Sequence, residues 1–167
     1  MCIRDSTIYF QSTPSPYFGL RDALITRLDS SGNIKWMNVY GGPGFDELEC
    51  IQYNNGMLYV AGIFSDAIIF DNDTVFSEGF DDIFVIKSDS SGMNHQINCF
   101  GGSTNDFVTD LKVSGDRVYV CGWFGNYLNM DGTVINGNAE EDAYIVAFDT
   151  ILPVSYTHLT LPTNREV

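Results

Sequence analysis

The sequence has few cysteines, few basic side chains and no long hydrophobic run. Its four cysteines are Cys2, Cys50, Cys99 and Cys121, and they neither recur nor pair in a pattern typical of a disulfide framework. Eight Lys and Arg stand against 22 Asp and Glu, which gives a formal net charge of −14. Such a surface repels phosphate backbones, so we expect no nucleic-acid partner. No stretch approaches the roughly 18 consecutive apolar residues of a membrane span.

A sustained apolar period of 3.6 residues is also missing, so the sequence predicts no helix. Hydrophobic residues nevertheless make up 44% of the chain and aromatic residues 14%, which is ample for a packed core. The sequence therefore predicts an ordered all-β protein. Cys99 and Cys121 occupy small apolar positions of the pattern described next, and we expect them to behave as buried hydrophobic residues.

The chain is organised by an internal repeat of constant length. Asp22, Asp82 and Asp142 are evenly spaced, and the Asp-Ser-Ser-Gly segment at 29–32 returns at 89–92 with the same spacing. Laying residues 19–78 over residues 79–138 gives 15 identities in 60 positions without a gap. Such self-similarity marks a repeat architecture, in which each unit needs neighbours to cover its apolar faces.

Each unit is predicted to contain four strands, which in the clearest copy are Glu47–Tyr53, Met57–Phe64, Asp82–Lys87 and Asn94–Phe100. The second and third strands contain near-continuous apolar runs, which indicates burial on both faces, whereas the more polar fourth strand suits an outer edge. Radial stacking of such sheets predicts a partial β-propeller of four-stranded antiparallel blades. A linear β-solenoid is the weaker alternative, because its coils are usually much shorter.

A long insert, Ser65–Phe80, separates the second and third strands, and Gly125–Glu140 matches it in the next copy. The insert makes the unit longer than WD40 or kelch blades, which run at roughly 40–50 residues. Its apolar residues indicate more than a solvent loop. We expect it either to extend the two strands or to form a small extra hairpin.

Both ends of the chain fall outside the repeat, which covers residues 19–149. Residues 1–6 and 153–167 resemble translated sequencing-adapter read-through, and our hypothesis is that neither belongs to the natural protein. Residues 7–18 are then interpreted as a linker or partial strand, and residues 150–152 as the end of the repeat region. The rest is expected to be an incomplete ring, whose remaining blades belong to its own full-length chain.

A set of motifs in the repeat resembles the SBBP-type bacterial β-propeller repeats. The motifs are Asp82-Ile83-Phe84, the Asp89–Gly92 segment, Phe100-Gly101-Gly102, Asp106 and Tyr119-Val120-Cys121-Gly122-Trp123-Phe124. The resemblance covers essentially the whole repeat region. Ser88 and the polar residues 94–96 depart from the family pattern, which affects the packing of the fourth strand. The resemblance implies a secreted or cell-surface bacterial protein.

Repeated acidic residues beside glycines are the candidates for a metal or cation site. Asp46 follows Gly41 and Gly42, and the same arrangement returns in the next copy with Asp106, Gly101 and Gly102. In a closed ring these carboxylates would lie near one mouth of the central channel. The turn propensity of Asp favours the alternative, a cap whose carboxylate accepts backbone N–H bonds of its own turn.

The segments Asp29–Gly32 and Asp89–Gly92 have two interpretations, a calcium loop and a hairpin turn. They lack the alternating ligands of an EF-hand, and a hard cation needs six or more oxygens. The hairpin turn is therefore favoured, with Asp29 and Gly32 and their copies Asp89 and Gly92 as turn residues. No cofactor is predicted, and calcium is the cation that the alternative interpretation would require.

Nucleophilic catalysis finds no support in the sequence, because His95 is the one histidine outside the suspect tail and a lone imidazole makes no triad. The sequence thus predicts a non-enzymatic extracellular or cell-surface scaffold for binding or adhesion, with a protein or glycan ligand. Trp123, Tyr127 and the insert are the predicted contact surfaces, and Trp123 equally suits a core position. The alternatives are the propeller portion of a secreted polysaccharide-active hydrolase or lyase, and a structural spacer domain.

Overall fold

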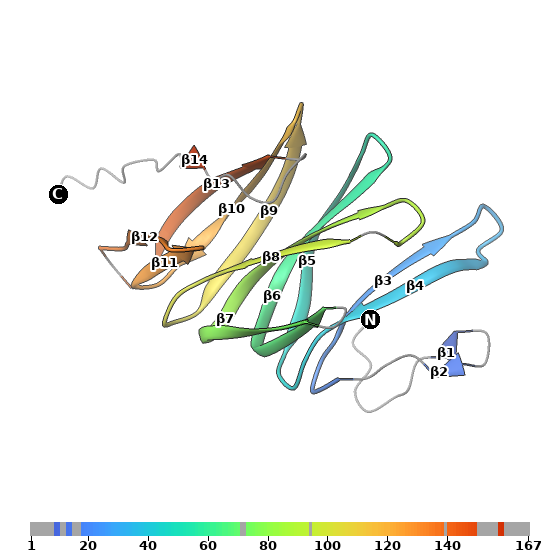
Figure 1. The fold of residues 1–167 in the computed structure, drawn as a ribbon, viewed down its shortest axis with the longest axis horizontal. Helices are drawn as coiled ribbons and strands as arrows, with labels where there is room; N and C mark the ends of the chain where they lie inside the picture. Colours follow the sequence, from blue (N-terminus) through green and yellow to red (C-terminus); the bar gives the residue numbers. More distant parts are fainter. Residues whose placement is uncertain are drawn as a thin grey trace.

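The protein is described here by a computed structural model, which covers residues 18–149 except 71–72, 94 and 139, together with the backbone of three short strands. The described residues form strands and turns and contain no helix (Figure 1). The all-β prediction is confirmed. Accordingly, no helix of the described residues is long and apolar enough to cross a membrane. The strands are β1 (Tyr9–Phe10), β2 (Thr13–Pro14), β3 (Ala23–Leu28), β4 (Ile34–Tyr40), β5 (Asp46–Asn54), β6 (Met57–Phe70), β7 (Asp73–Asp89), β8 (Gln96–Phe100), β9 (Asp106–Ser114), β10 (Arg117–Phe124), β11 (Tyr127–Met130), β12 (Thr133–Asn136), β13 (Asp142–Asp149) and β14 (Thr157–His158).

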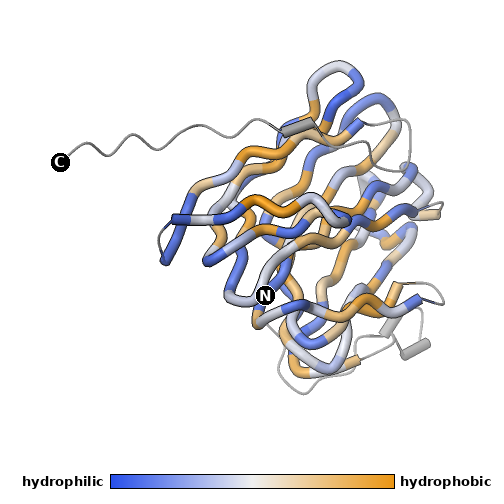
Figure 2. The backbone as a smooth tube through the Cα atoms, turned by 60° about the vertical axis from the view of Figure 1, so that its left-hand side comes forward, coloured by the Kyte–Doolittle hydropathy of each residue, from blue (hydrophilic) through white to orange (hydrophobic). Residues whose placement is uncertain are grey.

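The strands form antiparallel sheets that follow one another in chain order. One four-stranded sheet has the order β5-β6-β7-β8, a second has the order β14-β13-β10-β9, and the pairs β1-β2, β3-β4 and β11-β12 are two-stranded. Figure 1 shows β3-β4, then β5 to β8, then β9, β10 and β13 as successive layers. Hydrophobic residues gather along the strands and hydrophilic residues at many of the turns (Figure 2). The edge position of β8 agrees with the polar character that the sequence gives to the fourth strand.

The repeat of the sequence is also a repeat of the backbone. β9 (Asp106–Ser114) begins and ends at the positions that correspond to the bounds of β5 (Asp46–Asn54), and both carry a bulge opposite the glycine of the Tyr-Val-x-Gly-x-Phe motif. A methyl group on Gly62 would lie 2.0 Å from the carbonyl oxygen of Glu47, and one on Gly122 would lie 1.8 Å from that of Phe107. Glycine is required at both positions because the bulge brings the neighbouring backbone too close for a side chain.

The insert takes both of the predicted forms, one in each copy. In the first copy β6 continues to Phe70 and β7 begins at Asp73, so the insert extends both strands. In the second copy β10 ends at Phe124, and the insert forms a separate hairpin, β11-β12. The predicted end of the second strand at Phe64 and the predicted start of the third strand at Asp82 are therefore wrong for the first copy. The fourth strand begins at Gln96, and its predicted start, Asn94, lies outside the described residues.

Two hydrophobic clusters fill the spaces between successive layers. One lies between the two four-stranded sheets, with Ile83, Val120 and Leu128 fully buried. The other lies between β3-β4 and the sheet β5-β8, with Phe64, Ile68 and Phe84 fully buried. The middle strands β6 and β7 are therefore covered on both faces along their apolar runs, as those runs predict.

The terminal segments are described only in part. β1 and β2 pair with each other within residues 7–18, and the two residues of β14 pair with Val146 and Ala147 of β13. Residues 1–6, 150–152 and the rest of 153–167 lie outside the described residues. The hypothesis that residues 1–6 and 153–167 derive from a sequencing adapter stays a prediction.

Candidate functional site

The Gly-Gly motifs lie where the chain passes from one sheet to the next. We call Gly41-Gly42 and its surroundings the first junction, and Gly101-Gly102 and its surroundings the second junction. Gly41 and Gly101 each form an isolated antiparallel bridge to the following repeat, with Ile69 and Asn129 respectively. A methyl group on Gly42 would lie 1.7 Å from the carbonyl oxygen of Ala67. Glycine is needed here because two backbone segments pass in contact, and no strand–loop–helix phosphate site is formed.

Two carboxylates flank each Gly-Gly motif, and all of them are buried except the half-buried Asp22. At the first junction the Gly42 N–H donates to Asp46 Oδ2 at 2.9 Å, and the Phe18 N–H donates to Asp22 Oδ2 at 3.3 Å. At the second junction the Gly102 N–H donates to Asp106 Oδ2 at 2.5 Å. In each case the acceptor carboxylate lies four positions after the donor. This is the geometry of a side chain that closes its own turn.

The second junction contains the corresponding pair of acids, Asp82 and Asp106. The Glu78 N–H donates to Asp82 Oδ2 at 2.9 Å, and a methyl group on Gly101 would lie 2.5 Å from Asp82 Oδ1. Asp82 was part of the repeat period but was not a predicted site residue. The exact recurrence of Asp22 at Asp82 was the signal in the sequence that could have identified these partners.

Burial raises the pKa of these carboxyl groups, because the charged form loses its hydration. Asp46 is 2% exposed and Asp106 0% exposed, and desolvation raises the pKa of each to about 7. The pKa of Asp82 is raised to about 6 for the same reason. A neighbouring acid adds to the effect, since Asp22 acts on the pKa of Asp46 and Asp82 on that of Asp106. Asp46 and Asp106 are therefore partly protonated at neutral pH, whereas Asp82 is mostly ionised.

The two junctions do not have the features of a cation site. A hard cation such as Ca²⁺ takes six to eight oxygen ligands, and each junction offers two carboxylates whose bonded oxygens already accept backbone N–H groups. Within residues 18–149, apart from the gaps named above, no group of three or more His, Cys, Asp or Glu side chains is placed to hold a metal ion. Asp46 and Asp106 lie beneath the surface, and each accepts a backbone N–H of its own turn. Their role in this chain is therefore to stabilise the turn.

The Asp-Ser-Ser-Gly segments form tight hairpin turns. Asp29 Oδ1 accepts the N–H groups of Ser31 and Asn33, both at 2.9 Å, and Gly32 adopts a φ of 83°. Asp89 Oδ1 accepts the N–H of Ser91 at 2.9 Å in the second copy, where Gly92 has a φ of 75°. Each carboxylate therefore acts as an Asx-type acceptor, and a glycine supplies the positive φ.

A polar depression of about 800 Å³ lies beside the second insert hairpin. We call it the Tyr127 depression. It contains a tyrosine ring with its hydroxyl, three side-chain amides, a serine hydroxyl and a carboxylate. Its lining residues are Ser103, Asn126, Tyr127, Asn136, Gly137, Asn138 and Glu140. All of them lie in or next to the connections β8–β9, β10–β11 and β12–β13, where loops are held by the sheets.

Of the two predicted contact residues, Tyr127 lies in this depression and Trp123 does not. The Tyr127 hydroxyl donates to Glu78 Oε2 at 3.3 Å, which links the second insert hairpin to the preceding repeat. Trp123 is half-buried and stacks on Phe107, with ring centroids 4.3 Å apart. Sequence reasoning missed the amides Asn126, Asn136 and Asn138, because none of them belongs to a recognisable motif.

Burial lowers the reactivity of two of the three cysteines in the described part of the chain. Cys50, Cys99 and Cys121 are free thiols and half-buried rather than fully buried. Burial raises the pKa of Cys50 to about 11 and that of Cys99 to about 12, so both remain protonated at neutral pH.

Comparison with known proteins gives one partial similarity. The chain is 31% identical to the regulatory protein FlaEY of Caulobacter vibrioides over 103 residues, which is 59% of this chain and 11% of that protein. The chain thus spans about a tenth of the length of the relative it matches. No family model matches the sequence, and no solved structure matches it.

Proposed function

We propose that this chain is part of a bacterial extracellular or cell-surface β-propeller of the SBBP type, which serves as a non-enzymatic scaffold for binding or adhesion to a glycan. The proposal of a propeller is supported by antiparallel sheets that recur at a fixed offset in the sequence and bury hydrophobic clusters between them. Stacked repeats of this kind bury a continuous core and leave their connections free to vary.

The observation that carries the binding proposal is the composition of the Tyr127 depression. Side-chain amides, hydroxyls and carboxylates are donors and acceptors matched to sugar hydroxyl groups. A tyrosine ring offers a large apolar face with a polar tip, which suits the apolar face of a pyranose. The Tyr127 ring is fixed at its hydroxyl by Glu78, so little side-chain entropy is lost when a ligand binds.

The hydrolase alternative receives no comparable support. The acids with a strongly raised pKa, Asp46 and Asp106, are the natural candidates for a general acid, but both are buried and bonded to backbone N–H groups. A sugar cannot reach them in this arrangement. The scaffold role is also consistent with the name of the partly similar FlaEY, since a regulatory protein can act through binding alone.

A glycan microarray probed with the full chain, followed by titration calorimetry on the best glycan, tests the proposal. Tyr127→Ala is expected to weaken binding about tenfold or more, because the stacking face is lost. Tyr127→Phe keeps the ring and loses only the bond to Glu78, so most of the affinity should remain.

Tyr53→Ala is the matched control, since Tyr53 is an exposed tyrosine outside the depression. It should leave glycan binding unchanged. A chain that binds no glycan on the array would refute the proposed ligand class. Binding that survives Tyr127→Ala but is lost with Tyr53→Ala would refute the proposed site.

A further inference from the structure

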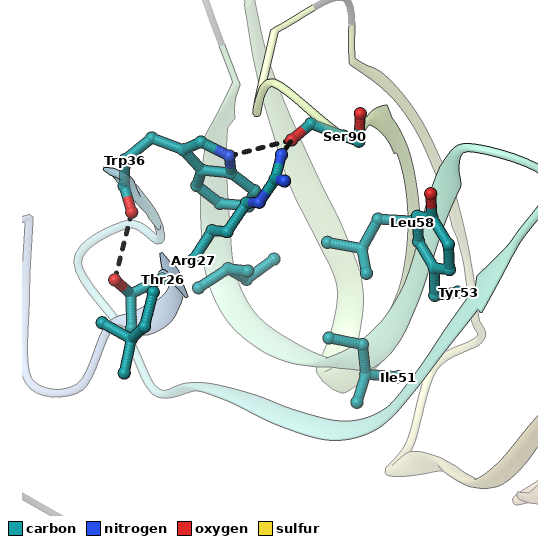
Figure 3. A pocket seen from close by; sticks show the side chains of 9 residues that line it. Thr26, Arg27, Trp36, Ile51, Tyr53, Leu58 and Ser90 are labelled. Carbon is teal, nitrogen blue, oxygen red and sulfur yellow. Dashed lines mark hydrogen bonds between the residues drawn. The ribbon is translucent and has the colours of Figure 1, made fainter. Parts of the chain in front are cut away.

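An apolar groove of about 410 Å³ lies between the pair β3-β4 and the sheet β5-β8 (Figure 3). Trp36 lies on one side of it, and Ile51, Tyr53 and Leu58 lie on the other. Ile51 and Tyr53 are each 62% exposed although they belong to a strand inside the stack of sheets. Large apolar side chains left open in this way mark an interaction surface.

The same positions one repeat later are fully covered. Leu111 and Val113 correspond to Ile51 and Tyr53, and they are only 4% and 6% exposed. They belong to the cluster between the two four-stranded sheets, together with Tyr59, Ala61 and Ile63 of β6. Two residues of β5 and β6, Cys50 and Met57, pack against the same cluster. The strands β5 and β6 therefore supply the cover that Ile51 and Tyr53 lack.

The rest of the cover is already in place at the groove. In the cluster between the four-stranded sheets, β7 and β8 contribute Ile83, Val85 and Phe100. Their counterparts one repeat earlier, Ala23, Ile25 and Tyr40, occupy the cluster beside the groove. The open space thus has the extent of two strands equivalent to β5 and β6, because the equivalents of β7 and β8 are present as β3 and β4.

The edge of β3 points to the same missing pair. β7, the counterpart of β3, pairs with β6 along one edge and with β8 along the other. Within the described part of the chain, β3 pairs only with β4. Tyr9 of β1 pairs with Pro14 of β2, just as Ile69 of β6 pairs with Thr74 of β7 one repeat later. The hairpin β1-β2 therefore has the same register as the end of the hairpin β6-β7.

We propose that this groove is the docking site of a two-stranded β-hairpin of the same repeat, equivalent to β5-β6 and supplied by the part of the protein that precedes β1. Its second strand pairs with the edge of β3 that faces away from β4, in the register of β6 on β7, so the position of Ala61 lies opposite Ile25. Its apolar face covers Ile51, Tyr53 and Leu58. This inference rests on the repeat of the backbone and not on the ligand of the Tyr127 depression.

A chain extended by one hairpin tests the proposal directly. Residues 1–6 are replaced by a copy of Asp46–Asp66, which joins Thr7 in register because Thr7 is the counterpart of Ala67 one repeat earlier. We expect the amides of Ala23–Leu28 to exchange with deuterium at least about tenfold more slowly than in the unextended chain, since they gain ladder bonds. The urea midpoint should rise as well.

Paired substitutions separate docking from a general gain in stability. Ile51→Asp should change the unextended chain little and abolish the gain in the extended chain. Leu111→Asp, at the covered counterpart, should destabilise both chains. Tyr59→Asp within the copied hairpin should remove the slower exchange, whereas unchanged exchange of Ala23–Leu28 in the extended chain would overturn the proposal.

Two further measurements keep the test decisive. If the extended chain does not fold, a synthetic hairpin with the sequence of Phe45–Ser65 is added to the unextended chain, and slower exchange in Ala23–Leu28 supports the proposal. Light scattering of the unextended chain examines the other occupant, a second copy. A dimer in which Ile51→Asp restores the monomer would assign the groove to self-association and overturn the proposal.

Discussion

Replacing Asp46 by Asn should stabilise the protein above neutral pH. Asp46 Oδ2 accepts the Gly42 N–H, while Asp46 Oδ1 is buried and has no hydrogen-bond partner among the described residues. An amide oxygen can accept the same N–H, and the amide removes the buried negative charge. Asp46→Asn therefore keeps the turn cap and eliminates the cost of ionising a carboxyl group beneath the surface.

The magnitude follows from the raised pKa of Asp46. The pKa is about 7 in the folded chain against an ordinary value of 3.8, so the folded chain binds more protons than the unfolded chain between these values. The stability due to this group is fully present below pH 3.8 and is lost as the pH rises through 7. Between pH 5 and pH 8 the loss is up to about 2.6 kcal/mol. Because water penetration reduces such effects, we expect Asp46→Asn to gain about 1–2.5 kcal/mol over the parent across this range.

The assay is urea unfolding at pH 5, 6, 7 and 8, followed by the fluorescence of Trp36 and Trp123. Asp106→Asn is the matched control, because both Asp106 oxygens accept a backbone N–H, from Gly102 and from Gly125. An amide has a single acceptor oxygen, so this variant should lose about 1 kcal/mol at pH 5, where Asp46→Asn loses little. Parallel pH profiles for Asp46→Asn and the parent would refute the reasoning, since they would mean that Asp46 is ionised in the fold.

Two further substitutions test the turns and the crossing of backbone segments. Gly42→Ala places a methyl group 1.7 Å from a carbonyl oxygen and should lower the free energy of unfolding by about 3 kcal/mol or more. Gly56→Ala, at a position with a φ of 83° and open space, should lower it by only about 1 kcal/mol. Equal losses of the two variants in urea unfolding would contradict this assignment. Asp29→Ala removes an acceptor of two backbone N–H groups and should lower the melting temperature at pH 7. Because those bonds lower the pKa of Asp29, the difference in melting temperature from the parent should shrink as the pH falls below 3.8, the ordinary pKa of Asp. A constant difference down to pH 2 would contradict the role of Asp29 in the turn.

The outlines of the fold could be predicted from the sequence because they depend on local patterns. The apolar run at Ile83–Ile86 predicted a strand covered on both faces, and all four side chains are buried. The Asp-Ser-Ser-Gly segments and the turn at 54–56 could be assigned from the conformational freedom of glycine and the hydrogen bonds of Asp. The boundaries of the insert could not be predicted, because the same length of chain continues the strands in one copy and forms a separate hairpin in the other.

The sequence by itself determined the period, the strand content and the turn residues, because each of these is set by a residue and its near neighbours along the chain. Tertiary structure decided which acids are buried and paired, which amides meet around Tyr127, and that Ile51 is open while Leu111 is covered. Those properties depend on which sheet lies against which. Two positions with the same pattern thus differ in burial because only one of them has a neighbouring layer to pack against.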